Sequence, residues 1–138
     1  MNPVQAAIAD WQAKRITGTA LMRALVSFDA WSLPVSEATA INLFNDPTNL
    51  GARLSRGTDG LTRLMLYSDA RFVSSAAARN VIAIKGEWVF DLNLAGVDEI
   101  AIDAGQPHEI RYKQPQFARL GQIAREVAAE RKASLAGN

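Results

Sequence analysis

The chain has 138 residues, a length that suits one domain better than two. Lys and Arg total 15 and Asp and Glu total 14, so the net charge is +1, and no basic stripe favours nucleic acid as a partner. The absence of cysteine excludes disulfides, thiolate zinc sites and thiol nucleophiles.

The first third of the chain predicts two helices and a strand. Apolar residues at helical spacing indicate a leading helix within residues 1–16, with Asn2 as its cap. A second helix is expected after Thr17, packed against the first as a short antiparallel pair. Residues 30–35 then alternate between apolar and polar or small side chains. Because Pro34 cannot donate a ladder hydrogen bond, we expect an edge strand here.

The middle of the chain contains its longest turn-rich stretch, residues 45–60, where Asn, Asp, Pro and Gly gather. The dense apolar run of residues 61–67 predicts a buried strand. Ser68 is expected to cap a helix that continues to about Arg79. Residues 81–84 predict another short buried strand.

The last third predicts a brief helix, a hairpin and a long closing helix. Gly86 is expected to open the brief helix. Residues 99–103 alternate, with Ile100 and Ile102 facing inward, and residues 108–112 return as the partner strand. The closing helix carries an apolar stripe from Phe117 to Ala128, and we expect residues 134–138 to fray.

These elements predict a single α+β domain over residues 1–138. Its expected architecture is a mixed sheet of four or five strands with helices packed on it, including a C-terminal amphipathic helix. The apolar spacing of residues 1–14 lacks the order of a signal peptide, and no segment is long enough to cross a bilayer. We therefore expect a cytoplasmic protein without a membrane partner.

The order of three segments carries a resemblance to a known family. A Trp-Ser-Leu-Pro-Val strand follows the helix pair, Leu64-Met65-Leu66-Tyr67-Ser68-Asp69 opens a helix, and the Gly-Val-Asp-Glu-Ile-Ala-Ile-Asp-Ala-Gly-Gln-Pro segment of residues 96–107 precedes a short strand and the closing helix. In this order, over roughly residues 17–128, the chain resembles the N-terminal domain of SseB-type proteins, the enhanced-serine-sensitivity family of bacteria. Asp103-Ala104-Gly105 stands where the family usually shows Asn-Pro-Gly. The resemblance implies the fold and supplies no catalytic residues.

The polar residues do not form a pattern typical of an enzyme. His108 is the only histidine, and no Gly-x-Ser-x-Gly elbow accompanies Ser74 or Ser75. We interpret the acidic residues near it as the polar face of an amphipathic strand. We thus expect no catalytic residue, metal or cofactor. The alternative is a hydrolase that uses His108 with the neighbouring acids Asp91, Asp98, Glu99 and Asp103.

Two places are candidates for binding. In the loop of residues 49–59, glycines allow backbone N–H groups to approach an anion, which Arg53 or Arg56 would grip. Trp31 lies on the expected edge strand, where it would be half exposed, and tryptophan is favoured at the centres of interfaces. The candidate contact residues are therefore Trp31, Arg53, Arg56 and Asp59.

These features favour a non-catalytic protein-interaction module with another protein as its partner. Our hypothesis is a bacterial cytoplasmic accessory or immunity protein associated with secretion or with a toxin. One alternative is a small-molecule or anion-binding domain that uses residues 49–59, and another is the hydrolase described above. An edge strand would also allow a homodimer.

Overall fold

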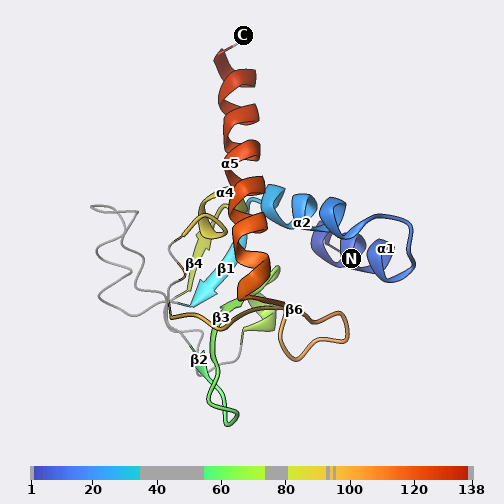
Figure 1. The fold of residues 1–138 in the computed structure, drawn as a ribbon. Coiled ribbons are helices and arrows are strands. Elements are labelled where there is room, and N and C mark those ends of the chain that lie inside the picture. The colour runs from blue at the N-terminus through green and yellow to red at the C-terminus, as the bar shows by residue number, and fades with distance from the viewer. Residues whose placement is uncertain (1, 35–54, 74–80, 93, 95, 137–138) are drawn as a thin grey trace.

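The computed structural model describes residues 2–34, 55–73, 81–92, 94 and 96–136 (Figure 1). The side chains of residues 55, 56 and 136 are outside this description. The elements are α1 (Pro3–Gln12), α2 (Gly18–Ser27), β1 (Trp31–Pro34), β2 (Ser55–Arg56), β3 (Thr62–Leu66), the 3₁₀ helix η1 (Ala70–Phe72), β4 (Val81–Ile84), α4 (Gly86–Val89), β5 (Glu99–Ile102), β6 (Ile110–Lys113) and α5 (Gln114–Ala136). The predicted α+β class is confirmed.

Local sequence signals place the first two helices. Asn2 caps α1 through a capping box: its Oδ1 accepts from the Gln5 N–H at 2.8 Å, and the Gln5 Oε1 accepts from the Asn2 N–H at 2.9 Å. Thr17 caps α2 by accepting from the Ala20 N–H at 3.1 Å. The cap of α1 is the residue that the sequence predicts, and α2 begins directly after Thr17 as expected.

The predicted mixed sheet of four or five strands is confirmed by a four-stranded mixed sheet, and β1 and β4 form a second sheet that the sequence does not predict. The larger sheet has the order β2-β3-β5-β6, in which β3 and β5 are parallel and the other pairs antiparallel. Its β2 strand is only two residues long. The smaller sheet is the antiparallel pair β1–β4. A bridge between Ser32 and Tyr67 connects the two sheets, with backbone hydrogen bonds of 2.7 and 3.1 Å.

β1 is an edge of the two-stranded sheet, as the sequence predicts, but it is not exposed. It pairs with β4 along one side and meets Tyr67 along the other, and all four of its residues are buried. Backbone groups two residues apart in a strand point to the same side. Pro34 therefore points as Ser32 does, away from β4, and its missing N–H removes no hydrogen bond of the β1–β4 pair.

Three further expectations are corrected. Asp69, not Ser68, caps the helical turn after β3: its Oδ1 accepts from the Arg71 N–H at 2.9 Å. This turn, η1, ends at Phe72, and residues 74–80 lie outside the description. The turn-rich stretch of residues 45–60 is not a loop throughout. Its residues 55 and 56 form β2, and residues 57–60 are the turn of the β2–β3 hairpin. The expected frayed tail is helical as far as Ala136.

The helices bury their apolar sides against the sheets. α5 rises from the end of β6 past α4, and its last turns extend beyond the rest of the described fold (Figure 1). The predicted stripe on α5 is confirmed at Leu120, Ile123, Ala124 and Val127, which are buried in the core. Arg131 fixes the helix one turn later, donating to the Ser27 carbonyl at 2.7 Å and to Asp29 Oδ1 at 2.5 Å.

Candidate functional site

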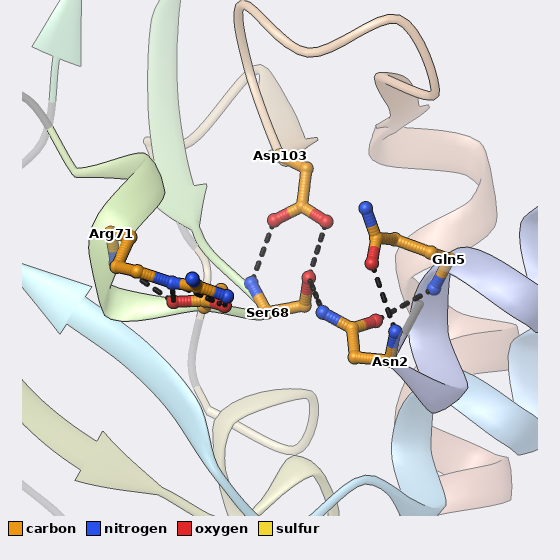
Figure 2. A network of polar contacts seen from close by, with 6 residues as sticks. Asn2, Gln5, Ser68, Arg71 and Asp103 are labelled. Atoms are coloured by element: carbon orange, nitrogen blue, oxygen red, sulfur yellow. Dashed lines mark hydrogen bonds and ion pairs between the residues drawn. The ribbon is translucent and has the colours of Figure 1, made fainter.

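A buried polar cluster lies at the carboxyl ends of the parallel strands β3 and β5 (Figure 2). Its centre is Asp103, which is fully buried and has a left-handed backbone with φ of 52°. Asp103 Oδ1 accepts from the Ser68 N–H at 2.6 Å. Its Oδ2 accepts from the Ser68 hydroxyl at 2.5 Å and lies 2.7 Å from His108 Nε2.

The cluster also reaches the first helix. Asn2 Nδ2 donates to Ser68 Oγ at 3.0 Å, as Figure 2 shows, while the same side chain caps α1. The ring of Phe72 lies 5.8 Å from the ring of His108. The Asp103 carboxylate thus connects the ends of β3 and β5 with the turn before β6. Ser68 in turn connects this cluster with the cap of α1.

The order of these contacts differs from that of a catalytic triad. In a Ser-His-Asp triad, histidine stands between the serine and the acid, so that it can take the serine proton. Here Asp103 stands between Ser68 and His108, and the Ser68 hydroxyl donates to the carboxylate. The contacts therefore fix the strand ends without preparing Ser68 as a nucleophile. The side chain of His108 is only 14% exposed.

The acidic residues near His108 are not a solvated strand face, so that interpretation of the sequence is wrong. Glu99 and Asp103 are both buried. Glu99 Oε1 accepts from Arg63 Nε at 2.8 Å, and Arg63 Nη2 also lies 2.5 Å from Asp59 Oδ2. The hydrogen bond from Arg63 lowers the pKa of Asp59. Asp59, a predicted contact residue, is thus paired within its own hairpin.

The remaining acids of the hydrolase hypothesis lie in separate contacts. Asp98 accepts from the Thr62 N–H at 2.7 Å, and Asp91 Oδ1 lies 2.7 Å from Arg125 Nη1. Among the described residues, Asp103 is the one of these four acids that contacts His108. Within the described ranges, no three His, Asp or Glu side chains lie close enough together to hold a metal ion.

Trp31 is not the half-exposed contact that the sequence suggests. It is fully buried, and its Nε1 donates to the Leu25 carbonyl at 2.9 Å. Its ring meets those of Phe28 and Phe90 edge to face, with centroids 5.1 and 6.0 Å apart. Arg53 and the side chain of Arg56 lie outside the described residues, so the anion-binding loop stays a prediction.

The exposed tryptophans are Trp11 and Trp88. Trp88 on α4 is 55% exposed and Trp11 on α1 is 39% exposed. The Lys85 ammonium lies 5.6 Å from the centre of the Trp88 ring. Because α4 has only four residues, it offers no helical period from which the exposed face could be predicted.

A surface hollow of about 590 Å³ lies between α5 and the segment after α4. Gly121, a glycine inside the last helix, is the sequence feature that could have pointed to it. The residues that line the hollow are Phe90, Asp91, Leu92, Leu94, Gln114, Phe117, Ala118, Gly121 and Arg125.

Comparison of the chain with protein-family models, with curated proteins and with solved structures finds no match. The resemblance to SseB-type domains therefore stays a prediction. Among the described helices, none combines the length and the apolar character needed to span a membrane.

Proposed function

We propose that this protein is a non-catalytic module that binds another protein through the surface around Trp88. The observation that carries the proposal is the 55% exposure of this large aromatic side chain. Tryptophan is enriched among the residues that dominate binding energy at protein interfaces. An exposed ring of this size is a ready anchor for a partner.

The backbone around Trp88 supports this role because it is fixed before binding. Gly86 starts α4 and donates its N–H to the Phe28 carbonyl at 2.8 Å, while Val89 and Phe90 are buried in the core. A side chain presented by a fixed backbone loses less conformational entropy on binding than one on a free loop.

The arrangement of Ser68, Asp103 and His108 supports the non-catalytic part of the proposal, since it leaves no activated nucleophile. The resemblance to SseB-type domains extends the proposal to its setting. We place the protein in the bacterial cytoplasm, as an accessory or immunity protein associated with secretion or with a toxin.

Affinity capture from an extract of the producing cells tests this proposal. The wild-type protein should retain a stoichiometric partner, and Trp88→Ala should retain at least tenfold less. Trp11→Ala is the matched control, because it removes the other exposed tryptophan from α1 and should leave capture unchanged. A partner that binds all three forms equally, or no partner above background, would contradict the proposal.

A hydrolase is the second candidate, and the 2.7 Å contact between His108 Nε2 and Asp103 Oδ2 favours it. A buried carboxylate can orient a histidine to serve as a general base. Release of nitrophenol from esters or phosphate esters by the wild type, lost in His108→Gln, would support this candidate. Equal rates for both forms would exclude it.

A further inference from the structure

Two small residues of α5 line the hollow. Ala118 and Gly121 are three positions apart on α5 and thus lie on the same side of the helix. Gly121 stands well inside a helix of 23 residues. Glycine is among the least favourable residues in a helix interior, so its presence there calls for a reason.

Close packing does not supply that reason. A Cβ atom added at Gly121 would lie 3.4 Å from Arg125 Nη1, 3.6 Å from the Phe90 carbonyl oxygen and 3.7 Å from Asp91 Oδ1. These are ordinary contacts or nearly so, and the nearest atom is the end of a flexible side chain. Alanine would fit, and glycine instead leaves space beneath the Arg125–Asp91 ion pair.

Part of the wall of the hollow is apolar. Leu92, Leu94 and Phe117 are only partly buried although they pack against the core. Each therefore keeps some apolar surface in contact with water, and an apolar side chain placed in the hollow would cover it. The hollow is open to solvent and has a volume of about 590 Å³.

The rim carries the charges. Arg125 Nη1 lies 2.7 Å from Asp91 Oδ1, and the two side chains are 63% and 41% exposed. Ion pairs that are this exposed contribute little to stability, so another carboxylate can compete for the guanidinium at small cost. Arginine binds carboxylates in a planar, two-pronged geometry. Asp91 can meanwhile accept from a backbone N–H of the occupant.

The geometry points to the hollow as the docking site for a partner segment in which an aliphatic side chain is followed closely by a carboxylate. The aliphatic group lies over Ala118 and Gly121 against Phe117, and the carboxylate lies on Arg125. Charge complementarity with Arg125 sets the choice of occupant. The inference rests on the proposed protein-binding function. Phe90, which lines the hollow, follows Trp88 by two residues.

The smallest probe with this chemistry is N-acetyl-leucine, which has the aliphatic group, the carboxylate and an N–H. Its binding is measured by the shifts of backbone amide resonances of the ¹⁵N-labelled protein at millimolar probe concentrations. We expect shifts confined to the segment after Trp88 and to residues 114–125 of α5. N-acetyl-leucinamide lacks the carboxylate and N-acetylglycine lacks the side chain, so each should bind at least fivefold more weakly.

Two variants test the site without threatening the fold. Ala118→Leu fills the hollow from an exposed position and should abolish the shifts, whereas Ala129→Leu, exposed elsewhere on α5, should leave them. Arg125→Gln should weaken binding of N-acetyl-leucine at least fivefold and leave that of N-acetyl-leucinamide unchanged. Arg119→Gln on the same helix is its control.

The inference is overturned if the wild type gives no shifts, if Ala118→Leu gives the same shifts, or if both control probes bind as well as N-acetyl-leucine. The proposed function can fail or survive separately. A partner whose capture depends on Trp88 but not on Ala118→Leu or Arg125→Gln would keep the protein-binding function and discard the hollow as its docking site.

Discussion

At the scale of single residues, Asp103 has the largest structural role in the polar cluster. Its left-handed backbone, with φ of 52°, is a conformation that aspartate tolerates better than most residues. The chain turns there toward His108, and the carboxylate turns back toward Ser68. Backbone geometry and hydrogen bonding thus select the same residue type.

Replacing this carboxylate should destabilise the fold. Asp103→Ala leaves the Ser68 N–H and hydroxyl buried without their acceptor, and it forces alanine into a left-handed conformation. Hydrogen bonds to a charged group are worth roughly 1.5–3 kcal/mol each, so we expect a loss of about 2–4 kcal/mol in the free energy of unfolding. Urea denaturation measures it.

Asp10→Ala is the control. Asp10 lies on α1 and forms an exposed ion pair with Arg15, which lies in the turn after that helix. Its effect should be within about 0.5 kcal/mol of zero. Equal stabilities for Asp103→Ala and Asp10→Ala would show that the cluster does not hold the strand ends together.

At the scale of elements, local patterns could be predicted and long-range pairing could not. The starts of α1 and α2 and the stripe on α5 depend on residues a few positions apart, so they can be recognised in the sequence. The division into two sheets depends on the pairing of β1 with β4, in which Trp31 meets Ile84, a residue 53 positions later. The sequence singled out both Asp103 and His108, but it could not show that Ser68 would join them.

Gly86 is a place where an element depends on the lack of a side chain. A Cβ atom there would lie 2.2 Å from the Val26 carbonyl oxygen, which belongs to the backbone of α2 and cannot rotate away. Gly86→Ala should therefore push α4 off α2 and destabilise the protein by about 1–3 kcal/mol, measured by urea denaturation. A wild-type stability for this variant would contradict the close approach of the two helices.

Gly121 should respond in the opposite direction. Its added Cβ meets no backbone atom closer than 3.6 Å, and alanine is the better helix former by about 1 kcal/mol. Gly121→Ala should thus raise the free energy of unfolding by about 0.5–1 kcal/mol and raise Tm. A loss of stability would mean that the helix at this position is packed more tightly than these distances indicate.

At the scale of the whole molecule, both tyrosines of the chain titrate differently once the protein folds. Burial raises the pKa of Tyr112 to about 12. Burial also raises the pKa of Tyr67, and the charges of Asp103 and Glu109 raise it further. Tyr112 lies on β6 and Tyr67 directly follows β3, and both side chains are buried in the folded protein.

This linkage predicts an alkaline loss of stability. In the unfolded chain a tyrosine ionises near pH 10, whereas the folded protein keeps both protons to higher pH. Above about pH 10 the folded state therefore binds more protons than the unfolded state, and the free energy of unfolding falls as pH rises toward 12. Below pH 10 the contribution of the tyrosines is complete and constant.

Phenolate absorbance and circular dichroism, followed together in an alkaline titration, measure this effect. Tyr112 should ionise near pH 12 and Tyr67 above its usual pKa, both in step with the loss of helical signal, while in concentrated urea both should ionise near pH 10. Tyr112→Phe should make the stability fall less steeply between pH 10 and 12, because one of the two linked protons is gone. Reversible ionisation of both tyrosines near pH 10 with full helical signal would contradict their burial, and with it the packing of β6 against the core.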